Sequence, residues 1–471
     1  MLFNSLAFLV FLPTVLVAYF FLPRKFRNLG LLIASYAFYA CWDARFLSLL
    51  IISTVVDYWC SKRIRDSSNQ AYRRRLLWLS LGVNLGLLAV FKYFNFFADN
   101  FIALLTLCGL DADPGLIRVI LPVGISFYTF QTLSYTIDVY RGDLEPADNI
   151  LDFAVYVSYF PQLVAGPIER ASNLLPQLYK DREFDRDQFI DGIGLIATGF
   201  FKKVVVADRC AALVNAGFAS DVLPYPGCQN WLFLYAFAFQ IYCDFSGYSD
   251  IARGVSKMFG IELMLNFGKP YLVSNPSRFW RHWHISLSTW LRDYLYIPLG
   301  GNRGGVSAVY RNLMITMVLG GLWHGAGWAF LFWGLYQGGL LVAHRFFLQD
   351  KIAIESRFAR GCLTIGFFHL VCVGWLLFRC GSLPPEVNAV WFILDSVKTL
   401  VSPELVGLEV GVFRTVLVMG VAVFLLQLRY ESFERFHSWT DTQKVAWLVF
   451  VLLCVALFGV FEGAEFIYFQ F

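Results

Sequence analysis

Apolar runs that approach the length of a membrane span recur along the whole chain, separated by short polar segments. A spanning helix needs ~20 mainly apolar residues. Runs of this kind, bounded by charged residues or by Pro and Gly, cover residues 2–22, 29–39, 46–60, 76–97, 119–139, 189–206, 231–242, 313–323, 328–343, 362–378, 412–426 and 445–461. Residues 153–164 form a further short run near Pro and Gly. This pattern predicts an all-α polytopic membrane protein with about eleven to thirteen membrane segments, some of them re-entrant or broken.

The composition agrees with a bilayer as the solvent. Of 471 residues, 58% are hydrophobic and only 15% are charged, a balance that a water-soluble domain of this size does not need. The formal net charge is +4 and the basic residues form short clusters rather than one face, so we expect no nucleic-acid partner. The ten cysteines include no Cys-x-x-Cys pair, so neither a metal site nor a disulfide framework is predicted.

The basic clusters also predict an orientation. Those at residues 24–27 and 62–75 are separated by two apolar runs and therefore lie on one face, which we expect to be cytoplasmic because short cytoplasmic loops retain Lys and Arg. The clusters at 345–360 and 429–444 reach the same face if the later helices alternate, which places both termini outside. Residues 2–22 follow no Lys or Arg and precede no cleavage site, so we interpret them as the first membrane helix of a single membrane domain spanning residues 1–471.

Residues 275–311 differ from the other polar segments because they combine Trp, Arg and His and end in a glycine-rich stretch. A helix over residues 279–294 places seven large apolar side chains in one stripe about 120° wide. The stripe contains Phe279, Trp280, Trp283, Leu287, Trp290, Leu291 and Tyr294, and the opposite side contains Arg281, His282, Ser286, Ser288, Thr289, Arg292 and Asp293. The pattern predicts one amphipathic helix along the membrane interface that ends before Pro298. On this helix His284 borders the apolar stripe and is directed inward.

The loop that follows, residues 300–305, reads Gly-Gly-Asn-Arg-Gly-Gly. Backbone N–H groups in such a loop can approach phosphates, including those of a coenzyme. A flexible surface connector is the alternative interpretation.

A second polar group stands in an apolar run, at His324 within Gly320–Gly327. An ionisable side chain in a membrane segment is costly and by default marks a functional site, although a histidine that bonds two helices together is the alternative. Gly321 and Gly325 form a Gly-x-x-x-Gly pattern, which recurs at residues 334–338 and predicts close approach of neighbouring helices.

Carboxylates also occur within apolar sequence. We expect Asp244 and Asp250 to lie at or near the membrane, where they either orient a histidine or an arginine or cap a helix at the interface. Lys202, Lys203 and Asp208 are predicted to form a structural set of snorkelling side chains and ion pairs.

Two motifs carry a resemblance to a known family. They are residues 278–294, Arg-Phe-Trp-Arg-His-Trp-His-Ile-Ser-Leu-Ser-Thr-Trp-Leu-Arg-Asp-Tyr, and residues 321–326, Gly-Leu-Trp-His-Gly-Ala. With residues 31–36, 121–130, 166–168 and 466–471, they make the chain resemble the membrane-bound O-acyltransferase family over nearly its whole length, in particular its bacterial AlgI and DltB branch. The resemblance implies the fold of that family, a ring of membrane helices around a central funnel with a tunnel. Alginate-type relatives usually carry Arg where this chain has His282.

The resemblance also implies an activity and its residues. His324 would be the catalytic histidine and His284 the second histidine of the motif. Imidazole suits the removal of a proton from a hydroxyl that attacks a thioester, while His284, Asn266 or nearby N–H donors would hold the acyl donor or the oxyanion. Candidate donor-binding and substrate-binding residues are Asn266, Arg281, Trp283, Ser288, Arg292, Asp293, Trp323 and Asp244. No Gly-x-Ser-x-Gly elbow is present, which argues against a serine acyl-enzyme.

The resemblance further implies a bacterial inner-membrane enzyme, in contact with membrane lipid and without a bound cofactor. The acyl donor would be cytoplasmic acetyl-CoA, and the product an exported polysaccharide such as alginate or cellulose, acetylated directly or through a periplasmic partner protein. Two other classes also fit many helices with buried polar residues, namely a transporter of polysaccharide or its lipid carrier and a non-catalytic scaffold of a secretion complex.

Overall fold

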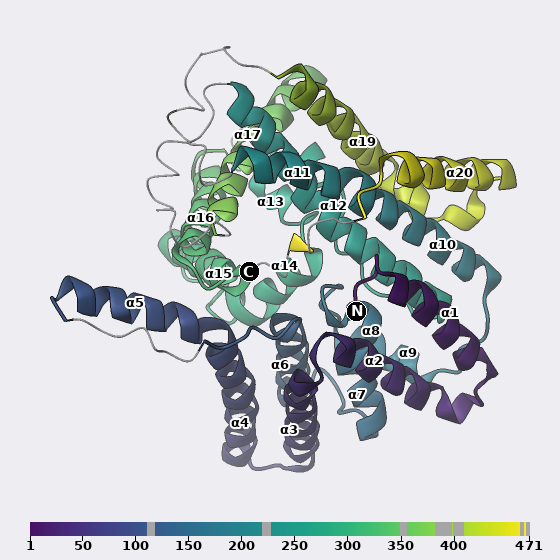
Figure 1. Cartoon of the computed structure of the whole chain (residues 1–471). Coiled ribbons are helices and arrows are strands. Elements are labelled where there is room, and N and C mark those ends of the chain that lie inside the picture. Colours follow the sequence, from purple (N-terminus) through teal and green to yellow (C-terminus); the bar gives the residue numbers. More distant parts are fainter. Residues whose placement is uncertain are drawn as a thin grey trace. The chain divides into compact units, whose positions relative to one another are not determined.

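The computed structural model describes residues 1–110, 118–218, 228–348, 356–381, 398, 409–461 and 466–467, and all regular elements among these residues are helices (Figure 1). The chain divides into two compact units, one formed by residues 1–189 and 255–264 and the other by residues 190–254 and 265–471. Tyr468–Phe471, part of the C-terminal motif noted above, lie outside the described residues.

The first unit contains the helices of the N-terminal part of the chain. They are α1 (Leu6–Phe21), α2 (Arg27–Asp43), α3 (Leu47–Asp66), α4 (Gln70–Leu88), α5 (Phe94–Leu107), α6 (Ile125–Arg141), α7 (Ile150–Ser158), α8 (Phe160–Leu163) and α9 (Ala171–Tyr179). The run at residues 153–164 is broken between α7 and α8 at Tyr159, which confirms the prediction of a broken segment there.

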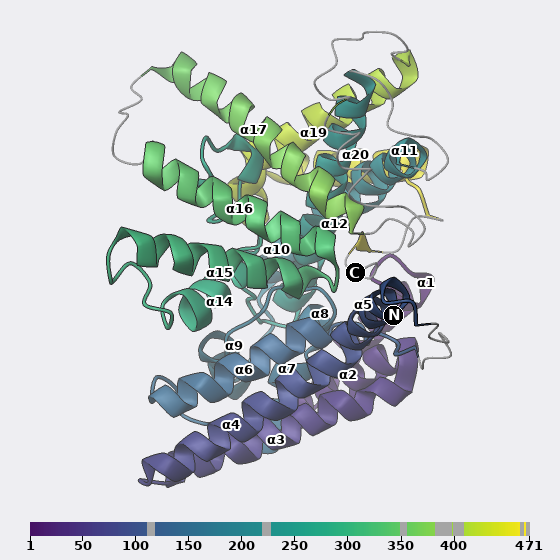
Figure 2. The same cartoon turned by 90° about the vertical axis from the view of Figure 1, so that its left-hand side faces the viewer.

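Helices α3, α4 and α6 lie side by side in this unit and enclose a polar cluster (Figures 1 and 2). Asp57, near the middle of α3, is fully buried. Its carboxylate accepts hydrogen bonds from the hydroxyl of Ser80, from Asn84 Nδ2 at 2.8 Å and from Thr136 Oγ1 at 3.3 Å. Three donors from two neighbouring helices thus replace the water that a carboxylate loses on burial.

The second unit contains the remaining helices. They are α10 (Arg186–Phe200), which begins in the first unit, α11 (Asp208–Gly217), α12 (Cys228–Met258), whose last residues belong to the first unit, α13 (Pro276–Phe279), α14 (Ile285–Leu291), α15 (Val306–His324), α16 (Trp328–Phe347), α17 (Arg357–Cys380), α19 (Val410–Glu434) and α20 (Asp441–Phe458). A π-helical stretch, η4 (Phe201–Ala207), joins α10 to α11.

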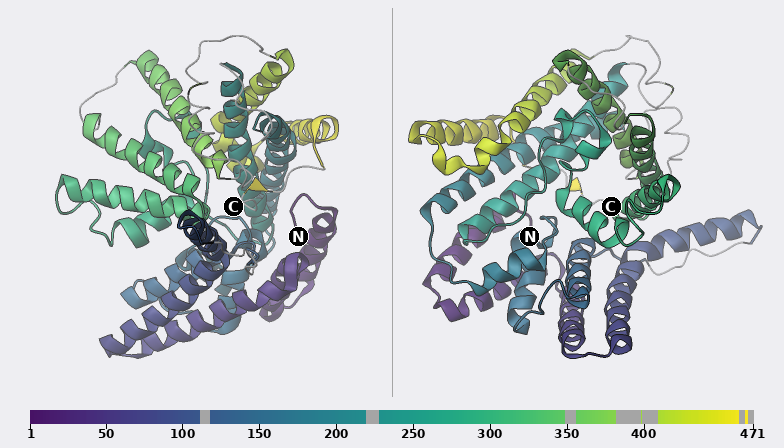
Figure 3. Two further views of the ribbon diagram at one scale, coloured as in Figure 1. Left: turned by 60° about the vertical axis from the view of Figure 1, so that its left-hand side comes forward. Right: turned by 180° about the vertical axis from the view of Figure 1, so that it is seen from behind.

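Helices α15 and α16 form an antiparallel hairpin whose backbones lie close together (Figures 2 and 3). A Cβ atom on Gly321 would lie 2.3 Å from the carbonyl oxygen of Phe330, and one on Gly334 would lie 2.5 Å from that of Met317. Neither position therefore accepts a side chain unless the helices separate. The close approach predicted from the glycine spacing is confirmed.

The apolar runs identified in the sequence all overlap helices, and the exposed surface of these helices is apolar. Six helical segments of the described chain are long and apolar enough to cross a membrane: 24–66, 70–107, 306–324, 357–380, 410–434 and 441–458, with the shorter Leu6–Phe21 beside them. Large side chains such as Leu6 (78% exposed), Phe21 (85%) and Leu457 (69%) point outward. Because water would not favour such a surface, the chain is a multi-pass membrane protein.

Candidate active site

The segment predicted as one helix over residues 279–294 is interrupted at His284, so that prediction is wrong. α13 ends at Phe279, a turn follows, and α14 begins at Ile285. His284 stands in the turn with φ 42° and ψ 57°, and it is the one non-glycine residue with positive φ in the described ranges. A left-handed conformation is unfavourable for a residue with a Cβ and persists only where surrounding contacts enforce it.

Asn266 supplies the contacts that hold this turn. Its backbone carbonyl accepts a hydrogen bond from Ile285 N at 2.9 Å. Its side-chain Oδ1 accepts from Ser286 Oγ at 2.9 Å and from Ser286 N at 3.3 Å, and lies 3.1 Å from His284 Nδ1. The amide nitrogen of Asn266 donates to Ser249 Oγ on α12 at 3.2 Å. The side chains in this set, those of Asn266, His284, Ser286 and Ser249, are all buried, so interior hydrogen bonds fix the turn.

The same contacts define the tautomer of His284. A backbone N–H can only donate, so the bond from Ser286 N identifies the atom facing it as Asn266 Oδ1. His284 Nδ1 therefore carries the proton that it shares with Oδ1, which leaves Nε2 as the acceptor of the ring. Burial, and in addition the neighbouring His324, lower the pKa of His284 well below its ordinary value, so the ring is neutral at physiological pH.

His324 is the last residue of α15 and is 4% exposed. Its ring lies 5.1 Å from that of Trp323, 5.0 Å from Trp333 on α16 and 5.4 Å from Phe378 on α17. The C-terminal end of a helix favours a positive charge. The surroundings of His324 thus suit an imidazole that takes up a proton.

The two buried histidines lie next to each other. Their ring centroids are 6.4 Å apart, and the Trp323 ring lies 5.8 Å from that of His284. Phe245 of α12 packs edge-on against His284 at 4.6 Å. Five elements of the second unit therefore converge on one pair of imidazoles: α12, the turn before α14, and helices α15, α16 and α17.

Some of the other predicted site residues contact the histidine pair and others do not. Trp323 and Asn266 contact it directly, as described. Trp283 is buried one layer away against Trp375 of α17, at 4.7 Å between ring centroids, and Ser288 Oγ donates to the carbonyl of Trp283 at 3.1 Å. Arg281 and Arg292 are exposed, and Arg292 pairs with Asp293 at 2.7 Å. Neither arginine is brought to the histidine pair.

Asp244 contacts neither a histidine nor an arginine among the described residues. It therefore does not orient such a side chain, contrary to expectation. Its Oδ1 pairs with Lys203 Nζ at 2.7 Å, and Lys203 also pairs with Asp208 at 2.8 Å. Its Oδ2 accepts from the backbone N–H of Ile467 at 2.7 Å. The predicted ion pair of Lys203 with Asp208 is confirmed, and Asp244 is a further member of that set.

The C-terminal segment reaches the site through this carboxylate. Phe466, which precedes the bonded Ile467, is 3% exposed and packs on Phe245 at 5.8 Å and on Tyr248 at 4.9 Å. Because Phe245 covers His284, the bond between Asp244 and Ile467 fixes a second layer of aromatic packing behind the histidine.

The glycine-rich loop after α14 is held by side chains. Gly300, Gly301, Gly304 and Gly305 all have positive φ. Asn302 Oδ1 accepts from the Tyr296 hydroxyl at 2.8 Å and from Arg345 Nη1 at 3.0 Å. This arrangement agrees better with a fixed loop than with a flexible connector.

Comparison of the sequence with known proteins identifies the family of this chain. Residues 147–380, which include both histidines, match the model of the membrane-bound O-acyltransferase family. The chain is 45% identical over 390 residues to the probable alginate O-acetylase AlgI of Azotobacter vinelandii, covering 81% of this chain and 76% of the relative. It is 42% identical over 422 residues to the protein of the same name from Pseudomonas aeruginosa, covering 87% and 79%. It is 37% identical over 421 residues to the peptidoglycan O-acetyltransferase of Helicobacter pylori, covering 81% and 78%.

Identity at this level over most of both chains exceeds what a shared fold alone would give. It also favours catalysis over the transporter and scaffold interpretations. The chain belongs to the membrane-bound O-acyltransferase family and is an O-acyltransferase.

Proposed function

We propose that this enzyme transfers an acetyl group from cytoplasmic acetyl-CoA to a hydroxyl of an exported polysaccharide such as alginate or cellulose, directly or through a periplasmic partner protein, in the bacterial inner membrane. The observation that carries the proposal is the pair of buried imidazoles of His284 and His324, 6.4 Å apart. We propose an acetyl group and a polysaccharide because the relatives are named as alginate O-acetylases and a peptidoglycan O-acetyltransferase.

In the proposed reaction His324 is the general base. The acceptor oxygen attacks the carbonyl carbon of the thioester while His324 takes the hydroxyl proton, and a tetrahedral oxyanion forms. The intermediate then expels the thiolate, the C–S bond breaks, and His324 returns the proton to sulfur. The C-terminal end of α15 stabilises the transient imidazolium.

His284 serves the acceptor rather than the oxyanion in this proposal. Its Nδ1 proton is shared with Asn266, so Nε2 can accept a hydrogen bond but cannot donate one. Because the attacking hydroxyl gives its one proton to His324, Nε2 of His284 suits a neighbouring hydroxyl of the polysaccharide, whereas an oxyanion needs a donor. Trp333 offers such a donor: its indole N–H is buried beside His324 and has no hydrogen-bond partner in the part of the chain that the structure describes.

The test of the proposal is transfer by the purified full-length chain in proteoliposomes. Radiolabelled acetyl-CoA would be supplied with alginate oligosaccharide, cello-oligosaccharide or no acceptor, and both free thiol and labelled glycan would be measured. We expect thiol release in step with labelled glycan for one of the two polymers. Labelling of neither polymer, with or without the periplasmic fraction, would contradict the proposed donor and acceptor.

Replacing Asn266 by alanine tests whether the turn at His284 positions that histidine. The change removes the acceptor for His284 Nδ1 and for two donors of Ser286, and should lower the free energy of unfolding by about 1–3 kcal/mol. Because His284 then loses its fixed tautomer, kcat should fall at least tenfold with KM for acetyl-CoA little changed.

The matched control is Thr289→Val, which removes the hydrogen bonds of one α14 hydroxyl to the backbone carbonyls of Ile285 and Ser286. Steady-state kinetics and thermal unfolding in detergent would be recorded for both variants. Equal effects of the two substitutions on kcat would show that Asn266 has only a structural role.

A further inference from the structure

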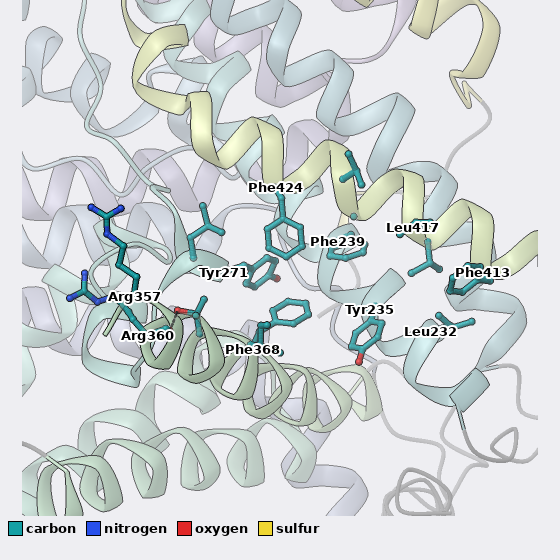
Figure 4. A pocket seen from close by; sticks show the side chains of 17 residues that line it. Leu232, Tyr235, Phe239, Tyr271, Arg357, Arg360, Phe368, Phe413, Leu417 and Phe424 are labelled. Atoms are coloured by element: carbon teal, nitrogen blue, oxygen red, sulfur yellow. Dashed lines mark hydrogen bonds between the residues drawn. The ribbon is translucent and has the colours of Figure 1, made fainter. Parts of the chain in front are cut away.

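An elongated groove with one charged end lies on the second unit, between α12, α17 and α19 (Figure 4). Its volume is about 740 Å³, within the range of cavities that hold a small organic ligand. Apart from two arginines, the lining is almost entirely apolar or aromatic. The lining residues are Leu232, Tyr235, Phe239, Tyr271, Leu272, Arg357, Arg360, Gly361, Thr364, Ile365, Phe368, Phe413, Val416, Leu417, Gly420, Val421 and Phe424.

The two walls of the groove are matching helix faces. On α17 the lining positions run from Arg357 to Phe368 with helical spacing, and on α19 they run from Phe413 to Phe424 with the same spacing. Each stripe covers eleven residue steps, or about 17 Å along the helix axis. This length is close to half of a bilayer hydrocarbon core of about 30 Å, so the groove matches the depth of one leaflet.

Aromatic rings form the floor. Phe239 stacks on Phe368 at 6.4 Å, and Tyr271 packs against Phe368 at 5.2 Å. Gly420 keeps the floor open, because a Cβ atom there would lie 3.1 Å from the Phe239 ring. Ile365 on one rim is 62% exposed and Leu417 on the other is 55% exposed, so the groove opens sideways toward the lipid.

The charged residues of the lining, Arg357 and Arg360, lie at one end of the groove. Figure 4 shows Arg357 and Arg360 together at the end where α17 begins, while Phe413 and Leu232 lie at the other end. Both arginines are exposed. Beyond Phe424 at the same end, the carboxylate of Glu431 is paired with Lys269 at 3.2 Å. That end therefore presents guanidinium groups beside apolar walls, which complements an anionic headgroup attached to hydrocarbon.

We propose that the groove is a binding site for an anionic phospholipid of the surrounding bilayer, with the acyl chains between α17 and α19 and the phosphate at Arg357 and Arg360. The basic clusters predict that this end faces the cytoplasm, so the lipid would come from the inner leaflet. The proposal does not depend on which acyl donor or polysaccharide the enzyme uses.

The groove lies directly behind the aromatic packing of the active site. The Tyr271 hydroxyl on its floor accepts a hydrogen bond from Trp375 Nε1 at 3.2 Å. Trp375 stacks on Trp333 at 6.2 Å, and Trp333 contacts His324. A lipid in the groove therefore covers the outer face of the layer that supports the catalytic histidine.

The test measures lipid preference of the purified full-length chain by native mass spectrometry and by thermal unfolding. Phosphatidylglycerol and phosphatidylcholine with identical acyl chains would be added in turn. We expect phosphatidylglycerol to bind more tightly and to raise the unfolding temperature more. The double variant Arg357→Gln/Arg360→Gln should bind phosphatidylglycerol roughly tenfold to thirtyfold more weakly while its affinity for phosphatidylcholine is unchanged.

Two further variants sharpen the test. Arg414→Gln removes an exposed arginine of α19 beside Phe413, at the opposite end of the groove, and should retain the preference. Val421→Trp fills the space between the walls and should weaken both lipids. Equal affinity of the wild type for the two lipids, or a preference that survives loss of both arginines, would show that only ordinary annular lipid contacts this surface and would overturn the proposal.

Discussion

Replacing His324 by alanine should lower the rate of acetyl transfer by about 10²–10⁴-fold and leave the enzyme folded in the membrane. The imidazole stands at the end of α15 among the rings of Trp323, Trp333 and Phe378. Among the histidines of the described residues, only His284 has a ring next to it. Without this base the acceptor hydroxyl attacks only as a neutral, weak nucleophile. Single-turnover transfer in proteoliposomes would measure the loss.

A second histidine of the same hairpin provides the control. His344 lies in the last turn of α16, twenty residues along the chain and partly buried, so His344→Ala removes an equivalent side chain far from the pair. It should transfer at close to the wild-type rate. A His324→Ala variant that inserts normally and still transfers at more than a tenth of the wild-type rate would contradict a general-base role.

Replacing Asp244 by alanine should cost about 3–5 kcal/mol of unfolding free energy, the largest stability effect that we expect for a single polar side chain here. The change leaves Lys203 buried with one carboxylate instead of two, and it removes the acceptor for the backbone N–H of Ile467. Asp244→Asn should be milder because an amide oxygen still accepts that bond.

Thermal unfolding in detergent would rank these variants. Asp293→Ala is the matched control, since Asp293 is partly exposed and pairs with the exposed Arg292, and solvent-accessible pairs contribute about 0–1 kcal/mol. Equal destabilisation by Asp244→Ala and Asp293→Ala would mean that the buried ion pairs do not hold α12 to the C-terminal segment.

Much of the fold follows from the apolar pattern, because hydrophobic length and glycine spacing are local properties. The runs that became α1, α15 and α17 are continuous in the sequence, and the contact of α15 with α16 depends on glycines four residues apart. His324 could likewise be identified from its place in an apolar run. Its aromatic neighbours on α16 and α17 could not, because they reach it only through packing between helices.

The turn at His284 shows where the pattern misleads. Residues 279–294 have a clear helical period, yet positive φ at a histidine has no signal in the sequence. The residue that enforces it, Asn266, is eighteen positions away, and its partner Ser249 lies on another helix. Asp244 is a similar case, since its backbone partner Ile467 lies 223 residues further along the chain.

The buried Asp57 also has a consequence for biogenesis. An aspartate at the centre of a spanning helix raises the cost of inserting that helix by about 2.5–3.5 kcal/mol when the helix enters the bilayer alone. Two of its donors, Ser80 and Asn84, lie on α4, which follows after a short turn. The free-energy cost of inserting Asp57 is therefore lower if α3 and α4 leave the translocon together as one hairpin. Thr136 on α6 adds its hydrogen bond later.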